Sequence, residues 1–480
     1  MLCHLPNMIN HCEFNFTCYR TSSKEDQGLW KSAMNNEIKL LHERKVWELV
    51  DLPKGCRTIK GRWVFAVKSD GRKKARFIAK GFAQIFGIDY EETFSPVTRF
   101  ETFQLLLSLA ALHDWEIEAL DVKTAYLFGE LDEEIYMDQP EGFVVKGQEK
   151  KVCRLKKSIY GLKQSALQWN KQLHKSLLEM KFIHCKTDPG TYFKIIGEEI
   201  IVLLIYVDDA LFMGSNKQQV LSHKAQFMKR WESRDLGQAK EYLDMRITRD
   251  CKKRTISLDQ TRYAEKVVQQ FGQENCKPVS VPLPTGYNLR PHSDQSSSNT
   301  TLRSRYQSVI GSLLYIMLGT RPDISFAVIK MSQFSSNPTE EHLQKALYIF
   351  RYLSSSKELC IVYSGTGDSN GLCAYSDTDW AGDVETSRST TGYAIFLGNG
   401  IVSWLSRRQR RVTLSSTEAE YCGMTETAKQ LRWIHNLYEE LGFKLGPLPL
   451  CVDNQGAIFL ASNPAQEGHT KHVRMTEHFI

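Results

Sequence analysis

Residues 200–209 read Ile-Ile-Val-Leu-Leu-Ile-Tyr-Val-Asp-Asp, an apolar run that ends in two adjacent acids. Eight consecutive apolar residues predict a strand that is buried on both faces, because a strand with one face in water alternates apolar with polar residues. Residues 210–214 are again mostly apolar, so we expect the chain to return antiparallel with Asp208 and Asp209 at the turn. The run is far too short to span a membrane as a helix.

The two aspartates at this turn are costly in an apolar setting, because like charges repel and burial removes their hydration. Divalent cations with oxygen ligands offset that cost, and two such ions about 3.5–4 Å apart activate an attacking oxygen while stabilising a leaving one. Asp121, at the end of a strand predicted over residues 116–121, is a candidate third ligand. An ordinary surface turn is the alternative, although a surface hairpin would place polar residues outward along its strands.

The composition is that of a globular chain with several domains. A length of 480 residues predicts about three domains, and a content of 42% hydrophobic and 24% charged residues excludes wholesale disorder. Twelve cysteines form no C-x-x-C pair, which argues against a disulfide framework or a paired-thiolate zinc site. No secretory signal or membrane segment is visible, so we expect an intracellular protein without a membrane partner.

The charged residues are unevenly distributed. Residues 51–80 hold ten Lys/Arg against two acids, and residues 149–163 hold six against one. Residues 407–411 add four arginines, whereas residues 116–138 hold eight acids against one lysine. Basic segments around an acidic centre suit a ligand that carries phosphates, held at its edges with metal ions in the middle. Solvated charged faces are the alternative.

Apolar periodicity and turn residues predict the secondary structure in outline. We expect helices over residues 29–44, 100–112, 165–180, 306–318 and 342–353. Strands are expected over residues 62–68 and 76–80, with a turn at 69–71. A hairpin is expected around residues 398–400, within a second compact unit that begins near residue 371.

Two segments are expected to lie outside the compact units. Residues 1–27 match no zinc site and are treated as an unassigned, loosely attached leader. Residues 278–301 contain four prolines and several serines with little apolar content, so they are predicted to be a linker.

A second set of acids lies near the C-terminus. Asp377 ends a strand predicted over residues 372–376, and Asp453 closes one over residues 448–452. Glu418 lies in Ser-Ser-Thr-Glu, a capping-box pattern that places it in the first turn of a helix. Acids at two strand ends and one helix start can converge on one point. Asp379 and Glu420 are alternatives, and each acid alone could be a helix cap or a surface residue.

Several ordered motifs resemble those of a known family. Tyr206-Val207-Asp208-Asp209 resembles the Tyr-x-Asp-Asp box of reverse transcriptases. The surrounding segments resemble the Pol polyprotein of copia-type LTR retrotransposons, and the similarity runs from about Trp30 to the last residue. They are Phe-Ile-Ala-Lys-Gly-Phe (77–82), Phe-Ser-Pro-Val (94–97), Leu-Asp-Val-Lys-Thr-Ala-Tyr (120–126), Ser-Ile-Tyr-Gly-Leu-Lys-Gln (158–164) and Thr-Arg-Pro-Asp-Ile (320–324).

The resemblance implies an α+β fold class and an order of domains. A right-hand polymerase with fingers, palm and thumb-like parts would occupy residues 28–277, followed by the linker. A helical connection over residues 302–365 and an α/β ribonuclease H-like domain over residues 371–480 would follow. The implied function is RNA-directed DNA polymerase, with two Mg²⁺ ions per active site and an associated ribonuclease H. The implied partners are an RNA template, a DNA primer, an RNA–DNA hybrid and deoxynucleoside triphosphates, in the cytoplasm (in a virus-like particle) or the nucleus.

The same resemblance implies roles for residues of the polymerase site. Asp121, Asp208 and Asp209 would hold two Mg²⁺ ions. Tyr126 matches the aromatic position that packs against the sugar and excludes a 2′-hydroxyl, with a core aromatic as the alternative. The cations expected to meet the triphosphate are Arg76 and Lys80, of which Lys80 could equally be a solvated strand residue. The loop below the template base would contain Tyr160 and Gly161, where glycine permits close backbone approach.

For the second site, the resemblance implies that Asp377, Glu418 and Asp453 bind another metal pair, which hydrolyses the RNA of a hybrid. Family members usually continue past residue 480 to a further carboxylate, so we expect a C-terminally truncated and impaired ribonuclease H. Asp244 replaces a usual glycine in a turn that resembles the primer-contacting one, where a charged residue is expected to strain the backbone. The alternative function is a non-catalytic, nucleic-acid-binding remnant of a decayed element.

Overall fold

The apolar run around residue 203 forms the middle of a six-stranded antiparallel sheet in the computed structural model. Across the sheet the strands are β12 (Ser233–Gln238), β5 (Glu116–Val122), β11 (Asp209–Gly214), β10 (Glu199–Tyr206), β9 (Thr191–Ile196) and β8 (Ile183–His184). The predicted return of the chain after Asp208 is confirmed, because Tyr206 and Asp209 are paired in register. The structure describes residues 23–67, 71–284, 289, 299–366 and 371–462.

Both faces of this sheet are covered, which explains why β10 is almost entirely apolar. Leu203 and its alternate neighbours pack in one core with α4 (Ser165–Glu179) and α5 (Lys217–Arg230). Val202 and Leu204 pack on the other face with α3 (Phe100–His113). Because successive side chains of a strand point to opposite faces, a strand between two cores needs apolar residues throughout. The helices predicted over residues 100–112 and 165–180 are confirmed.

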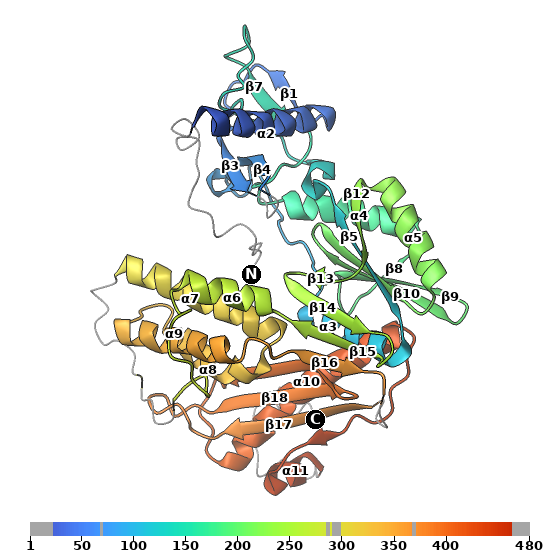
Figure 1. Cartoon of the computed structure of the whole chain (residues 1–480), viewed down its shortest axis with the longest axis vertical. Helices are drawn as coiled ribbons and strands as arrows, with labels where there is room; N and C mark the ends of the chain where they lie inside the picture. Colours follow the sequence, from blue (N-terminus) through green and yellow to red (C-terminus); the bar gives the residue numbers. More distant parts are fainter. Residues whose placement is uncertain (1–22, 68–70, 285–288, 290–298, 367–370, 463–480) are drawn as a thin grey trace.

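The N-terminal part lies at the top of Figure 1. It contains α2 (Lys24–Glu43), the hairpin of β3 (Gly61–Val67) and β4 (Lys73–Ala79), and a sheet ordered β1 (Trp47–Val50), β7 (Val152–Leu155), β6 (Tyr136–Met137) and β2 (Thr58–Ile59). Helix α2 begins before the predicted residue 29, because the side chain of Ser23 caps it by accepting from the Asp26 amide. Residues 24–27 are therefore helical and not part of a leader, whose residues 1–22 lie outside the described part.

A helical part and a small sheet follow the central sheet. Helices α6 (Thr261–Gln270), α7 (Thr300–Gly319), α8 (Ser325–Ser332) and α9 (Glu340–Ser355) pack around a core of their own. Helix α7 begins inside the predicted linker, most of whose residues from 285 onward lie outside the described part. The predicted helical connection over residues 302–365 does not remain helical to its end. Its last segment is β16 (Ile361–Ser364), in a sheet ordered β13 (Glu241–Tyr242), β14 (Met245–Asp250), β15 (Thr255–Asp259) and β16.

The C-terminal unit is a four-stranded sheet covered by a long helix. Its strands are β19 (Gly400–Arg408), β18 (Thr390–Leu397), β17 (Leu372–Asp379) and β20 (Leu450–Cys451), followed by α11 (Gln455–Ser462). Helix α10 (Ser416–Glu440) packs on β17, which is parallel to β20. The hairpin predicted around residues 398–400 is confirmed. Strand β17 continues beyond the predicted residue 376, and residues 463–480, where the truncation was expected to act, lie outside the described part.

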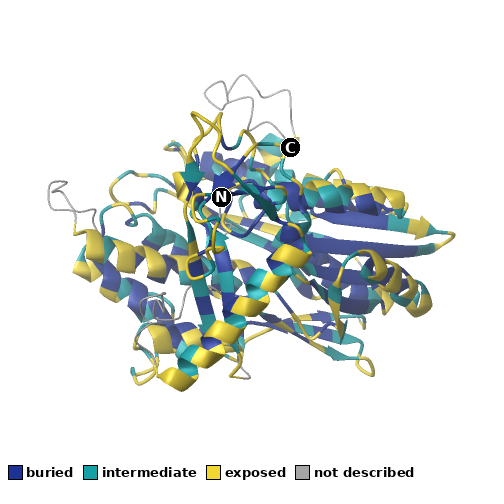
Figure 2. Ribbon diagram, turned by 90° about the horizontal axis from the view of Figure 1, so that it is seen from above, coloured by how far each residue is buried: buried dark blue, intermediate teal, exposed yellow. Residues whose placement is uncertain are grey.

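One continuous core joins the C-terminal unit to the central sheet. Side chains of α3, of β14 and β15, of β17 to β19 and of α10 all belong to it. Figure 2, seen from above, shows the strands buried in the interior and the helices with exposed outer faces. The Ser108 hydroxyl, on α3, reinforces the junction by donating to the Leu397 carbonyl at 3.1 Å. Trp404 Nε1 connects the C-terminal unit to α7 by donating to the Met317 carbonyl at 3.0 Å. Among the described residues, no helix is both long enough and apolar enough to cross a membrane.

The turn between β13 and β14 is predicted to gain stability from Asp244→Gly. Leu243 and Asp244 both have left-handed backbone, with φ of 50° and 56°, as the tight hairpin requires. Glycine adopts this conformation without the steric cost of a Cβ atom, so we expect the free energy of unfolding to rise by up to about 1 kcal/mol. Urea denaturation would measure it. Asp51→Gly, at an exposed position without positive φ, should instead lower stability, and an equal loss at both positions would contradict the prediction.

Candidate functional site

The pairing of β5 with β11 brings the first three acids together. Asp121 and Asp209 are directly opposite each other in the register of the two strands, and Asp208 lies in the turn before β11. The Asp208 carbonyl accepts from the Val122 amide at 2.8 Å, which ties that turn to the end of β5. The acids from positions 121, 208 and 209 therefore share one end of the central sheet, as the sequence predicted.

The turn that carries Asp208 is held in an unusual conformation. Val207 has a φ of 58°, which is rare for a β-branched residue because its Cβ crowds the backbone. Its carbonyl accepts from Trp169 Nε1 at 2.7 Å, and Trp169 is buried under the sheet. The tight connection between Tyr206 and Asp209 thus places both aspartates at the sheet end, and the Trp169 indole fixes its backbone.

Electrostatics at this end of the sheet favour a bound cation. Burial raises the pKa of Asp209 to about 7, and the charges of Asp208, Asp121 and Asp244 contribute. The pKa of Asp208 is also raised by burial and by Asp121, while Arg76 and Lys74 lower it. Asp121, Asp208 and Asp209 are partly buried at this end of the sheet, and their carboxylates are oxygen donors of the kind that a hard divalent ion such as Mg²⁺ prefers.

Most of the predicted nucleotide-binding residues form a stack beside these acids. The Arg76 guanidinium lies over the Tyr160 ring at 4.2 Å from its centroid, and the Tyr160 and Tyr126 rings meet edge to face at 5.1 Å. Tyr126 belongs to η3 (Ala125–Phe128), the short helix that follows β5. Burial raises the pKa of Tyr160 to about 12, so this phenol is protonated at neutral pH. Tyr160 is therefore in contact with both Arg76 and Tyr126.

Gly161 is required by a close backbone approach. Its φ is 93°, and a Cβ atom there would lie 2.2 Å from the Ala79 carbonyl oxygen. The Tyr160 carbonyl accepts from the Ala79 amide at 2.8 Å. The close approach expected of this glycine is thus made to the end of β4, and it fixes Tyr160 beside Arg76.

Sequence analysis did not identify Lys74, a second cation beside Arg76. Lys74 lies two residues before Arg76 on β4, so both side chains are on the same face of the strand. Lys74 lowers the pKa of Asp208 and of Glu37, as Arg76 does. Lys80 lies one residue beyond β4, at the start of η2 (Gly81–Ala83), and its amide donates to the Lys60 carbonyl. Because side chains alternate between the two faces of a strand, the position of Lys74 two residues before Arg76 could have identified it from the sequence.

A second group of acids lies in the C-terminal unit. Carboxylate oxygens of Asp377, Glu420 and Asp453 all lie within 4.8 Å of one another. Asp377 lies inside β17 rather than after its end, and Asp453 follows β20. Burial raises the pKa of Glu420 to about 7, with Asp377 and Asp453 contributing, although its carboxylate accepts from the Thr378 amide at 3.1 Å. This donor set also suits a hard divalent cation.

Glu418, predicted as the third acid of this group, lies elsewhere. The Ser415 hydroxyl accepts from the Glu418 amide at 3.1 Å, so the predicted helix cap is present. The Glu418 carboxylate, however, accepts from the Leu414 amide at 2.7 Å and pairs with Arg411 at 3.2 Å. Side chains two residues apart on an α-helix point about 200° apart, so Glu418 and Glu420 cannot face the same point. The alternative acid Glu420 therefore takes the place expected of Glu418.

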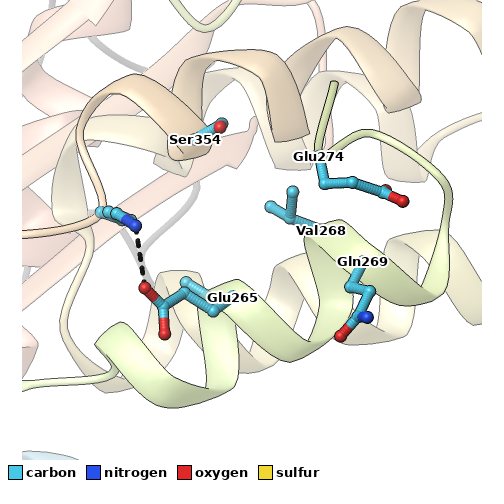
Figure 3. A pocket seen from close by; sticks show the side chains of 7 residues that line it. Glu265, Val268, Gln269, Glu274 and Ser354 are labelled. Atoms are coloured by element: carbon cyan, nitrogen blue, oxygen red, sulfur yellow. Dashed lines mark hydrogen bonds and ion pairs between the residues drawn. The ribbon is translucent and has the colours of Figure 1, made fainter. Parts of the chain in front are cut away.

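A hollow of about 260 Å³ lies between α6 and α9 (Figure 3). The residues that line it are distinct from those of the two acid groups. At one end the Lys357 ammonium pairs with Glu265 at 2.8 Å. Its walls are Ala264, Glu265, Val268, Gln269, Glu274, Ser354 and Lys357.

Comparisons with known proteins find relatives along most of the chain. A family model described as reverse transcriptase (RNA-dependent DNA polymerase) matches residues 44–285. The chain is 41% identical to the retrovirus-related Pol polyprotein from transposon TNT 1-94 of Nicotiana tabacum, over 93% of this chain and 34% of that protein. It is 37% identical to that from transposon RE1 of Arabidopsis thaliana, over 94% of this chain and 31% of that protein.

A shorter relative is matched along its whole length. The putative transposon Ty5-1 protein of Saccharomyces cerevisiae is 31% identical, over 65% of this chain and 100% of that protein. By contrast, the chain spans about a third of the length of the two plant polyproteins.

The raised pKa of Asp209 predicts that Asp209→Asn stabilises the protein in EDTA. The folded state holds the proton more tightly than the unfolded state, whose pKa is near 3.8, so this carboxyl costs stability as pH rises from about 4 to about 7. At pH 7.5 the gain from Asn has an upper limit of about 4 kcal/mol, and it shrinks towards pH 5. Thermal melts at both pH values would measure it.

Added Mg²⁺ should reverse the order of the melting temperatures of Asp209→Asn and the parent, because the ion offsets the repulsion only where all the carboxylates are present. We expect Mg²⁺ to raise the melting temperature of the parent more than that of Asp209→Asn. Asp51→Asn, on the exposed surface, serves as the matched control and should follow the parent. An Asp209→Asn variant that melts below the parent in EDTA at pH 7.5 would refute the electrostatic account.

Proposed function

Because this chain belongs to the reverse transcriptase family of copia-type retrotransposon Pol polyproteins, we propose that it is an RNA-directed DNA polymerase. It would add deoxynucleotides to the 3′-hydroxyl of a DNA primer on an RNA template. The observation that carries this proposal is the register of β5 and β11, which sets Asp121 opposite Asp209 with Asp208 in the adjoining turn. In the language of polymerases, the central sheet would be the palm, the N-terminal part the fingers and the helices α6 to α9 the thumb and connection.

Asp121, Asp208 and Asp209 would hold Mg²⁺ ions, which supply the activation of a hydroxyl and the neutralisation of phosphate charge. The residues around them would bind and orient the deoxynucleoside triphosphate. Arg76 is suited to bidentate phosphate contact, and Lys74 adds a second cation on the same face of β4. Lys80 is a weaker candidate for contact with the triphosphate, because it lies beyond the end of that strand.

The aromatic residues would set the position of the nucleotide. The Tyr160 ring lies against the Arg76 guanidinium and limits its movement. Tyr126 packs edge to face against Tyr160 in the short helix that follows β5, where its ring could exclude a sugar 2′-hydroxyl. Gly161 would keep the loop close to β4 beneath the template base.

Primer extension on an RNA template with Mg²⁺ tests the polymerase. We expect Asp208→Ala to lower incorporation of deoxynucleotides by on the order of a hundredfold or more, since it removes a carboxylate from the acid group. Asp51→Ala is the matched surface control and should extend primers as the parent does. If the parent binds primer–template in a salt-dependent way but incorporates no nucleotide, the non-catalytic remnant is the better description.

We also propose that the C-terminal unit is a ribonuclease H that hydrolyses the RNA strand of an RNA–DNA hybrid. The convergence of Asp377, Glu420 and Asp453 from a strand, a helix and a strand end supports this second function. These three residues would hold Mg²⁺, which supplies an activated water and neutralises the phosphate. Thr378, whose amide donates to Glu420, would keep that carboxylate turned towards the two aspartates.

Glu420→Gln is expected to abolish Mg²⁺-dependent cleavage of a hybrid, because an amide is a poorer ligand for a hard cation. Cleavage of a labelled RNA strand would be measured beside the melting temperature of each variant. Glu426→Gln, on the same helix but paired with Arg407, is the matched control and should cleave as the parent does. Equal cleavage by the parent and Glu420→Gln would remove the second acid group from the reaction.

A further inference from the structure

A short loop before α10 is fixed to the body of the C-terminal unit although it carries exposed apolar side chains. In this loop, residues 410–414, Val412 is 48% exposed and Leu414 is 77% exposed. Thr413 between them is buried, its hydroxyl lies 3.0 Å from the Ser389 hydroxyl, and its carbonyl accepts from Trp380 Nε1 at 3.3 Å. Val412 and Leu414 are therefore two exposed apolar side chains, one residue apart, on a loop that is held in one position.

Glu418 makes two contacts that hold this loop against the helix. One carboxylate oxygen accepts from the Leu414 amide at 2.7 Å, and the other pairs with Arg411 at 3.2 Å. The carboxylate is almost fully buried, with the residue 6% exposed, so both contacts are made away from solvent. In such a place, contacts to a charged group are stronger than on the surface, so loss of the carboxylate should release the loop.

The loop contacts the segment that follows β17, the strand that carries Asp377. Glu420 is two residues beyond Glu418 on α10, and Trp380, which donates to Thr413, is three residues beyond Asp377. The charge of the loop is positive. Arg411 is turned towards Glu418, whereas Arg410 is exposed. An exposed guanidinium beside exposed apolar groups suits a nucleic acid backbone, which offers phosphates and sugars side by side.

We propose that Glu418 is a positioning residue, which holds loop 410–414 so that Arg410, Val412 and Leu414 contact the RNA–DNA hybrid beside the second acid group. The inference rests on the proposed ribonuclease function. The two acids of this helix turn would then have different roles. Glu420 would belong to the metal-binding group, and Glu418 would position the surface on which the hybrid lies. A purely structural Glu418 would affect stability without affecting the affinity for hybrid.

The test measures cleavage and binding in the full chain. A DNA–DNA primer–template in excess occupies the polymerase region, so that a short labelled hybrid reports on the C-terminal unit. For Glu418→Gln we expect KM to rise about fivefold, as the loss of a contact worth about 1 kcal/mol would give, while kcat changes less than twofold. Glu420→Gln should instead lose kcat, and Glu426→Gln should match the parent in both constants.

Binding of the same hybrid in EDTA, followed by fluorescence anisotropy, needs no cleavage. Glu418→Gln should raise Kd about as much as KM, and Arg410→Gln should lower the dependence of log Kd on log salt by about one. Leu414→Ser leaves the backbone amide and Arg411 in place, so its folding is not in question. It should weaken binding about twofold, through loss of buried apolar area.

The possible outcomes separate the two proposals. A parent that binds hybrid but does not cleave it, with Kd raised in Glu418→Gln, overturns the ribonuclease function and supports the positioning role. A parent that cleaves, with KM and Kd unchanged in Glu418→Gln and Leu414→Ser, overturns the positioning role alone. Loss of kcat in Glu418→Gln as severe as in Glu420→Gln would also overturn it, since Glu418 would then act in the metal-binding group.

Discussion

The structure depends on one pairing, in which β5 and β11 lie side by side between two apolar cores with Asp121 and Asp209 facing each other at one end. Left alone, these carboxylates repel, and burial deepens the repulsion. They remain close because packing on both faces fixes the register: a slip of one residue would turn Leu211 and Phe212 to the wrong cores. Hydrophobic packing therefore holds together the charges on which the proposed chemistry depends, and a bound cation would offset their repulsion.

Part of this arrangement could be predicted from local periodicity. The run of β10 and the return into β11 follow from strand alternation and a tight turn. The meeting of Asp121 with Asp208 and Asp209 was expected from the motifs that resemble reverse transcriptases, because the pairing of β5 with β11 leaves no local pattern. The second acid group was harder. Its helix start was recognisable at Ser415, but which of Glu418 and Glu420 faces the strands depends on the rotation of α10 on β17. Capping motifs locate the end of a helix without defining that rotation.

Long-range packing was beyond sequence reasoning for a related reason. The sequence indicated separate units on either side of a linker, yet α3 and α10 contribute to the same core as the strands between them. The Glu440 carboxylate at the end of α10 accepts from the amides of Lys186 and Thr187, and Trp433 Nε1 donates to the Thr187 carbonyl at 3.1 Å. No local sequence pattern predicts these long-range hydrogen bonds, because each partner resembles an ordinary surface residue within its own segment.

The position of β16 in the sequence affects how the chain folds while it is being synthesised. Its partner β15 ends at Asp259, and β16 begins at Ile361, so the edge of that sheet stays open until about 100 further residues have been synthesised. At ribosomal rates of roughly 5–20 residues per second, that interval lasts on the order of 5–20 s. During it, the backbone groups of β15 can pair with another nascent strand. Translation speed between these strands, and chaperones near the ribosome, would then decide how much polypeptide reaches the native sheet.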